Sequence, residues 1–190
     1  MMKLTGRQQQ LLEFVKQQHG SQMRKYEPLP YWHHLYEVAR LVSEHIKTDG
    51  AIEIAVCHDL LEDTACTREA LEEKLRHLGY EADLVRYISE GVVGMTDVFI
   101  AKDYPDLNRK ERKKLEAERL GTTSSIVHSV KYADMTDNVK SIVSGDPGFA
   151  RVYMNEMTAI LDQMRQGNIH LLINCCSEFS YALSKLRDTR

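Results

Sequence analysis

Apolar residues recur with the period of an α-helix along almost the whole chain, and almost no stretch alternates as a β-strand does. The segment from about Ala51 to Glu62 is apolar nearly all round, which predicts a buried central helix. Two stretches are irregular, because residues 24–30 contain two prolines and residues 94–108 contain Pro105. The other helices are expected at about residues 5–19, 31–47, 67–77, 81–93, 109–119 and 124–144, followed by two amphipathic helices within about 147–186. The sequence therefore predicts an all-α bundle, and we expect a single domain over residues 1–190.

The composition is that of an ordinary globular protein, with 43% hydrophobic and 28% charged residues in a chain of 190. This length can fill one core, and the net charge of −3 gives no general attraction to nucleic acid. No apolar run approaches the roughly 20 residues that span a bilayer, and the start lacks the apolar core of a signal peptide. The four cysteines show no Cys-x-x-Cys spacing, so reduced structural thiols are expected. We therefore expect a soluble, cytoplasmic protein that binds neither nucleic acid nor membranes.

Four potential ligands of one divalent metal ion lie on three of the predicted helices: His34, the adjacent pair His58 and Asp59, and Asp134. An unpaired carboxylate on the apolar central helix would be costly, so Asp59 needs a partner, and a metal ion is the strongest one. Two imidazoles and two carboxylates suit a borderline ion. We expect Mn²⁺, with Fe²⁺ or Zn²⁺ as alternatives. The other interpretation is an ordinary helix with a salt-bridged aspartate and hydrogen-bonded histidines.

Two further carboxylates follow one helical turn downstream. Glu62 lies four residues after His58 and Asp63 four residues after Asp59, which in a helix places both on the side of the ligands. A carboxylate near a metal-activated water can take its proton or orient it toward phosphorus. Both are therefore candidate catalytic residues. The alternative is that the pair only caps the helix end before Thr64.

Four motifs occur in a fixed order over about residues 11–144. They are Arg24-Lys25, Pro30-Tyr31-x-x-His34-x-x-x-Val38-Ala39, His58-Asp59-x-x-Glu62-Asp63-Thr64 and Lys131-x-Ala133-Asp134-x-x-x-Asn138. Together they resemble the RelA/SpoT-type HD-domain hydrolases, in particular the small alarmone hydrolases and the metazoan SpoT homologues, which have only the hydrolase function.

This resemblance implies an HD-domain fold and Mn²⁺-dependent hydrolysis of guanosine 3′,5′-bis(diphosphate) to GDP and pyrophosphate, that is, a (p)ppGpp 3′-pyrophosphohydrolase. It implies that the two histidines and two aspartates named above are the metal ligands and that Glu62 and Asp63 activate water. Arg24 would stack on the guanine and Lys25 would line the nucleotide site, because a flat guanidinium suits a base and an ammonium suits a phosphate. By position, Asn138 and Ser141 would contact the sugar or phosphates.

Three positions depart from the family pattern and remove positive charge: Asp97, Met135 and Asp137. The basic residues 109–114 could compensate, although a solvated helix face is the favoured interpretation. Two other functions therefore stay open. One is hydrolysis of another phosphorylated nucleotide, such as NADPH at its 2′-phosphate or a nucleoside monophosphate. The other is a nucleotide sensor without turnover.

Overall fold

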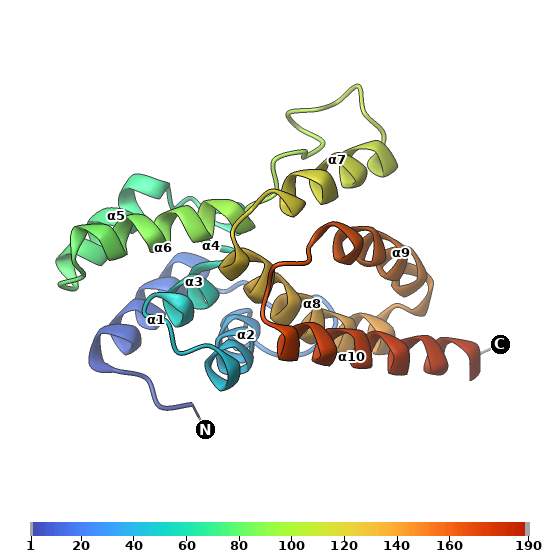
Figure 1. Ribbon diagram of the computed structural model, residues 1–190, viewed down its shortest axis with the longest axis horizontal. Coiled ribbons are helices and arrows are strands. Elements are labelled where there is room, and N and C mark those ends of the chain that lie inside the picture. Colours follow the sequence, from blue (N-terminus) through green and yellow to red (C-terminus); the bar gives the residue numbers. More distant parts are fainter. Residues whose placement is uncertain (1, 189–190) are drawn as a thin grey trace. The chain divides into compact units, whose positions relative to one another are not determined.

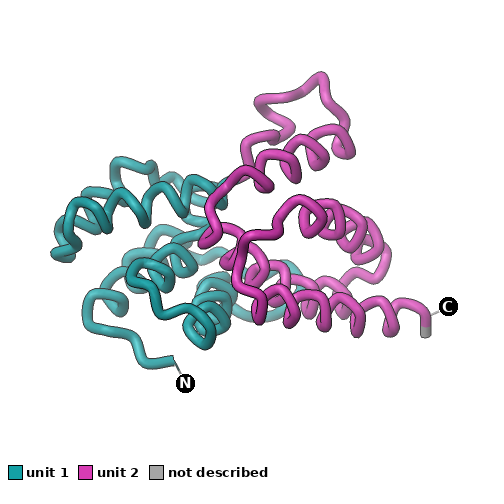
Figure 2. Tube along the Cα trace, in the orientation of Figure 1, with its two compact units in different colours: residues 1–96 teal, residues 97–190 magenta. Residues whose placement is uncertain are grey.

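The computed structural model describes residues 2–188, which form helices and one isolated antiparallel bridge between Met23 and Pro30 (Figure 1). The chain divides into two compact units, residues 1–96 and 97–190 (Figure 2). The first unit contains α1 (Gly6–His19), α2 (Trp32–His45), α3 (Ala51–Cys57), α4 (Leu60–Asp63), α5 (Arg68–His77) and α6 (Ala82–Met95). The second unit contains α7 (Arg109–Gly121), α8 (Ser125–Gly145), α9 (Pro147–Gln163) and α10 (Ile169–Asp188). The all-α prediction is confirmed, whereas the single domain over residues 1–190 stays a prediction.

Two expectations about the chain as a whole can be compared with the described residues. None of the helices within residues 2–188 is long and apolar enough to cross a membrane. The four cysteines are free thiols, and three of them are buried. The burial of Cys57, Cys66 and Cys175 fits structural thiols, whereas Cys176 is exposed. The reduced state of the four cysteines stays a prediction.

Helix α3 is the buried element of the first unit, and it packs against α1, α2 and α6. Ile54 and Ala55 are fully buried, as the apolar pattern predicted. Helix α6 approaches closely, since a Cβ added at Gly91 would lie 2.5 Å from Cδ1 of Ile54. Helix α1 begins with a capping box, in which the side chains of Thr5 and Gln8 each accept the other's backbone N–H. The packing of α1, α2 and α6 holds α3 in place, and α3 leads directly to the predicted metal ligands.

The helix predicted to run continuously over residues 51–62 is interrupted. Helix α3 ends one residue before His58, and α4 begins one residue after Asp59. Asp59 has φ −98° and ψ 2°, outside the usual α-helical region, and its carbonyl oxygen accepts the backbone N–H groups of both Glu62 and Asp63. The predicted single helix is therefore wrong at this point, and two of the candidate ligands lie at the break.

Helix α8 is the most buried helix of the second unit and packs against α9 and α10. Its side chains bind the loop between those two helices. The Tyr132 hydroxyl donates to the carbonyl oxygen of Met164 at 2.6 Å, and Nδ1 of His128 accepts the N–H of Gln166 at 3.1 Å. The other ring nitrogen of His128 donates to the carbonyl oxygen of Leu120 at 2.9 Å. Burial lowers the pKa of His128, which favours the neutral ring that this pair of bonds requires.

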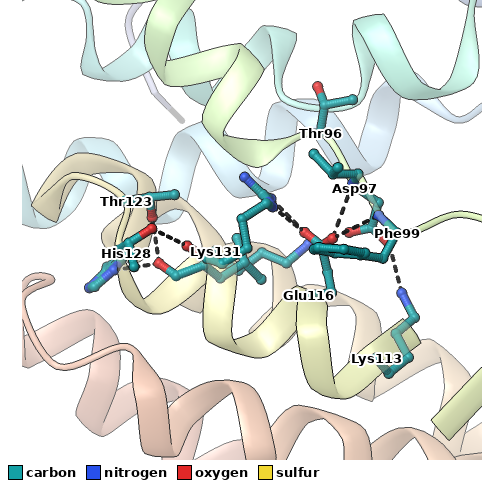
Figure 3. A network of polar contacts seen from close by, with 12 residues as sticks. Thr96, Asp97, Phe99, Lys113, Glu116, Thr123, His128 and Lys131 are labelled. Carbon is teal, nitrogen blue, oxygen red and sulfur yellow. Dashed lines mark hydrogen bonds and ion pairs between the residues drawn. The ribbon is translucent and has the colours of Figure 1, made fainter. Parts of the chain in front are cut away.

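A buried carboxylate holds the start of the irregular segment that precedes α7 (Figure 3). Glu116 is 1% exposed, and its Oε2 accepts the backbone N–H groups of Val98 at 3.0 Å and Phe99 at 3.1 Å. Its Oε1 accepts from Nε of Arg119 at 2.7 Å. One charged side chain thus supplies acceptors for two backbone donors and a guanidinium.

We expect Glu116→Ala to lower the free energy of unfolding by about 2 kcal/mol, because two backbone donors and a cation lose their buried acceptor. Glu118→Ala is the matched control, since Glu118 is about half exposed and lies 3.8 Å from Lys114. It should cost less than about 0.5 kcal/mol. Denaturant unfolding measures both, and equal stabilities of the two variants would contradict the assignment.

Candidate metal and catalytic site

Three of the four predicted metal ligands come together in the first unit. His34, His58 and Asp59 each offer one ligand atom, and these atoms all lie within 4.8 Å of one another. Oδ2 of Asp59 lies 3.0 Å from Nε2 of His58 and 3.7 Å from Nε2 of His34. The two imidazoles are buried, whereas the Asp59 side chain is 18% exposed. The cluster therefore has a partly accessible side at its carboxylate.

The tautomer of His58 is the one that metal binding needs. Its Nδ1 lies 2.8 Å from the carbonyl oxygen of Ala55, which can only accept a hydrogen bond. Nδ1 therefore carries the proton, and Nε2 presents its lone pair beside Asp59 in the neutral ring. Burial raises the pKa of the neighbouring Cys57 thiol well above its ordinary value.

The break between α3 and α4 explains how neighbouring residues can serve one ion. Successive side chains on a regular α-helix point about 100° apart. The non-helical backbone of Asp59 turns its carboxylate toward the His58 ring and gives the 3.0 Å separation. Two imidazole nitrogens and a carboxylate oxygen are donors that Mn²⁺, Fe²⁺ and Zn²⁺ accept. The residues present therefore fit a borderline divalent ion.

The candidate catalytic carboxylates Glu62 and Asp63 form the end of α4, and both are exposed. Oδ2 of Asp63 accepts a hydrogen bond of 3.0 Å from Nε2 of Gln22. Two accessible carboxylates just after a ligand pair are suited to receive protons from water.

The predicted base-binding and phosphate-binding residues lie in the loop between α1 and α2. Arg24 is buried, and its Nε lies 2.5 Å from Oε2 of Glu27 in the same loop. Lys25 is exposed, and its ammonium group lies 4.9 Å from the centroid of the Tyr26 ring. The loop closes on itself through a 2.9 Å bond from the Arg24 N–H to the carbonyl oxygen of Leu29. The substrate-binding roles of Arg24 and Lys25 stay predictions.

The remaining predicted site residues lie on α8 in the second unit. Asp134 is buried, with Nζ of Lys131 at 2.9 Å from one carboxylate oxygen and Nδ2 of Asn138 at 2.6 Å from the other. Ser141 donates to the carbonyl oxygen of Asn138 at 3.1 Å. Burial raises the pKa of Tyr153 on α9, and the negative charge of Asp134 raises it further. The roles of Asp134 as fourth ligand and of Asn138 and Ser141 in substrate binding stay predictions.

The basic residues at the start of α7 pair with acidic residues of the second unit. Arg109 binds Glu156 with its Nε at 2.7 Å. Figure 3 shows the other pair, in which Lys113 binds Asp97 at 2.6 Å. Asp97 is one of the positions that depart from the family pattern, so its negative charge is balanced within its own unit. Lys113 and Asp97 are only 28% and 17% exposed, so the solvated helix face stays a prediction.

Sequence reasoning missed three polar side chains near the cluster. The Tyr31 hydroxyl donates to Oδ2 of Asp59 at 2.6 Å, and its ring stacks on His19 with centroids 5.2 Å apart. Nδ1 of His19 lies 2.7 Å from Oε1 of Gln22, the residue that also contacts Asp63. Tyr31 lies within the second motif, whereas His19 and Gln22 lie outside all four motifs, so motif spacing gives no signal for these two residues.

An all-helical protein in which a histidine and an aspartate follow the buried helix and face a second histidine has the architecture of an HD domain. The fold is also that of a solved structure described as a metazoan ortholog of SpoT that hydrolyzes ppGpp and plays a role in starvation responses. The similarity has a TM-score of 0.76 at 23% identity and covers 95% of this chain and 98% of that one. The predicted HD-domain fold is confirmed.

Among curated proteins, the chain is similar to guanosine-3′,5′-bis(diphosphate) 3′-pyrophosphohydrolase MESH1 of Drosophila melanogaster. The two are 26% identical over 139 residues, which are 72% of this chain and 69% of that protein. A shorter match to GTP pyrophosphokinase rsh of Brucella ovis is 37% identical over 60 residues, 32% of this chain but only 8% of the relative. No family model matches the chain. The similarities confirm the resemblance to small SpoT-like HD hydrolases.

Proposed function

We propose that this chain is a metal-dependent (p)ppGpp 3′-pyrophosphohydrolase that converts guanosine 3′,5′-bis(diphosphate) to GDP and pyrophosphate. The observation that carries the proposal is the cluster of His34, His58 and Asp59, with its ligand atoms within 4.8 Å, in an HD-type fold. The relatives supply the substrate class, since MESH1 is named for this reaction. A cytoplasmic location belongs to the same proposal.

Mn²⁺ is the ion we propose for this cluster. His34 and His58 would bind it through their Nε2 atoms and Asp59 through its carboxylate, with Asp134 as the fourth ligand predicted from the sequence. When bound, such an ion polarises a phosphoryl oxygen and lowers the pKa of water. The chain's own task is then to hold the imidazoles in the correct tautomer, which the Ala55 carbonyl does for His58.

The remaining residues would handle the proton and the nucleotide. Glu62 and Asp63 would accept the proton of the attacking water and orient it toward the 3′-diphosphate. On the substrate side, Arg24 would contact the guanine and Lys25 the phosphates, while Asn138 and Ser141 would contact the sugar or phosphates. Attack of water on the phosphorus bonded to O3′ would form a new P–O bond and break the P–O3′ bond. The leaving group is then the 3′-oxygen of GDP, which takes up a proton to become a 3′-hydroxyl, while pyrophosphate carries the oxygen of the water.

Product analysis tests the proposal directly. The purified protein is mixed with guanosine tetraphosphate in the presence of Mn²⁺ or of EDTA, and GDP and pyrophosphate should appear only with Mn²⁺. Release of phosphate from NADPH or from a nucleoside monophosphate, without turnover of guanosine tetraphosphate, would support the second nucleotide phosphohydrolase function instead. A metal-loaded protein that binds guanosine tetraphosphate without turnover would be a sensor.

We expect Arg24→Ala to weaken binding of guanosine tetraphosphate by about tenfold or more, because one stacked base contributes about 1–3 kcal/mol. Adenine nucleotides should lose much less. Calorimetric titration of the Glu62→Gln background, which should bind without turnover, measures both affinities.

Glu27→Ala is the control for Arg24, because it breaks the same ion pair in the loop and keeps the guanidinium. If Glu27→Ala weakens guanine binding as much as Arg24→Ala does, the effect comes from the loop conformation. That outcome would contradict a contact between Arg24 and the base.

A further inference from the structure

A chain of two hydrogen bonds leads from a buried histidine to a candidate catalytic carboxylate. Nδ1 of His19 lies 2.7 Å from Oε1 of Gln22, and Nε2 of Gln22 lies 3.0 Å from Oδ2 of Asp63. His19 is 7% exposed, whereas Asp63 is exposed. The amide of Gln22 thus connects the interior of the first unit to the accessible end of α4.

The Asp63 carboxylate determines which groups donate and which accept in these two hydrogen bonds. An ionised carboxylate only accepts hydrogen bonds, so the amide NH₂ of Gln22 must face Asp63. The amide oxygen of Gln22 then faces His19, which must donate from Nδ1. The other ring nitrogen, Nε2, is buried and has no hydrogen-bond partner within the described residues. The amide oxygen of Gln22 therefore accepts the hydrogen bond from Nδ1 of the buried His19 ring.

The same histidine supports the metal cluster on its other side. The Tyr31 ring stacks on His19 at an interplanar angle of 23°, and its hydroxyl donates to Oδ2 of Asp59 at 2.6 Å. Tyr31 also meets the edge of the His34 ring, with centroids 5.6 Å apart. One buried imidazole thus contacts both a residue that holds Asp59 and a residue that holds Asp63.

The backbone of the loop between α1 and α2 fixes these side chains. The Gln22 N–H donates to the carbonyl oxygen of His19 at 3.0 Å, and the Gln22 carbonyl accepts the N–H of Tyr31 at 2.9 Å. The adjacent bridge between Met23 and Pro30 closes the loop. Gln22 is therefore held on both sides of its peptide unit, so its amide can restrain a carboxylate on another helix.

We propose that His19, Gln22 and Tyr31 form a positioning network for the two functional aspartates. Gln22 orients the Asp63 carboxylate toward the attacking water, and Tyr31 orients the Asp59 carboxylate. His19 contacts the side chains of both Gln22 and Tyr31 and holds them in place. The inference rests on the proposed hydrolase function and deepens it. None of the three is a catalytic residue, because each acts through an aspartate. Groups of this kind typically change activity or metal affinity by about 10- to 100-fold when removed.

The test is Gln22→Met, which keeps the length of the side chain and removes both hydrogen bonds. We expect kcat for guanosine tetraphosphate to fall by about 10- to 100-fold, with KM and Mn²⁺ content changed less than about threefold. Gln18→Met is the matched control, since Gln18 is an exposed glutamine one residue before His19. It should leave kcat unchanged.

A double-mutant cycle separates positioning from a merely structural role. In the Asp63→Asn background, Gln22→Met should cost less than about twofold, because Gln22 acts through the Asp63 carboxylate. Equal losses of kcat in both backgrounds would overturn the proposal. So would an unaltered kcat for Gln22→Met in a protein that turns over its substrate.

A spectroscopic measurement tests the network without reference to turnover. In ¹⁵N-labelled protein the His19 ring, assigned by its loss in His19→Asn, should carry its proton on Nδ1, and this preference should vanish in Gln22→Met. A proton on Nε2 in the wild-type protein would contradict the network. Absence of turnover by the Mn²⁺-loaded wild-type protein contradicts the proposed function instead, so the two failures are distinguishable.

Discussion

Asp59→Ala is expected to lose bound Mn²⁺ and to lower turnover of guanosine tetraphosphate by more than about 1000-fold. The Asp59 carboxylate lies within 3.7 Å of both imidazoles, and its removal leaves two neutral ligands from the first unit. A metal ion contributes several kcal/mol of charge stabilisation in phosphoryl chemistry, and each 1.36 kcal/mol is a factor of ten in rate. Metal analysis of dialysed protein, together with product analysis, measures both effects.

Asp83→Ala is the control for this variant, because Asp83 has a 92% exposed side chain in the same unit and lies on α6. It should retain both the metal and the activity. A full complement of Mn²⁺ in Asp59→Ala would contradict the ligand assignment, and the hydrogen-bonded interpretation of the cluster would then hold.

The all-α fold could be predicted because the apolar residues that become buried recur in the sequence with the period of a helix. The all-round apolar pattern before His58 predicted a buried helix, and α3 is fully buried at Ile54 and Ala55. The capping residues Thr5 and Thr67 fall at the helix starts, where their side chains accept backbone N–H groups. Helix positions follow from such local signals.

The break at Asp59 could not be predicted in the same way, because Leu60 and Leu61 continue the apolar pattern across it. The backbone leaves the helical region at a single residue, and that change brings the Asp59 carboxylate to 3.0 Å from His58. Residues in sparsely populated backbone regions often occur at functional sites. Here the helical periodicity fails at the functional residue.

The metal cluster could be predicted from the sequence because histidine and aspartate are recognisable as metal-ligating residue types. Gln22 carries no such signal, and its partner Asp63 is 41 positions away in the sequence. Tyr31 is part of the second motif, yet its hydroxyl bond to Asp59 spans 28 positions. The groups that orient a site are set by long-range contacts, which neither periodicity nor motif spacing records.

Glu62→Gln is expected to keep Mn²⁺ and nucleotide affinity while kcat falls by about 10²- to 10⁴-fold, the usual contribution of a general base. Glutamine has nearly the same shape but cannot accept the proton of the attacking water. Because the lost interaction is made in the transition state, kcat and kcat/KM should fall together. Steady-state kinetics with guanosine tetraphosphate, beside direct titration of binding, measures this.

Glu73→Gln is the matched control for Glu62→Gln, because Glu73 is an exposed glutamate of the same unit on α5. Its kinetics should equal those of the wild-type protein. A Glu62→Gln variant with a raised KM and an unchanged kcat would show that Glu62 binds the substrate instead of activating water. Asp63 would then be the remaining candidate base. The hydrogen bond from Gln22 would in that case orient the carboxylate that accepts the proton of the attacking water.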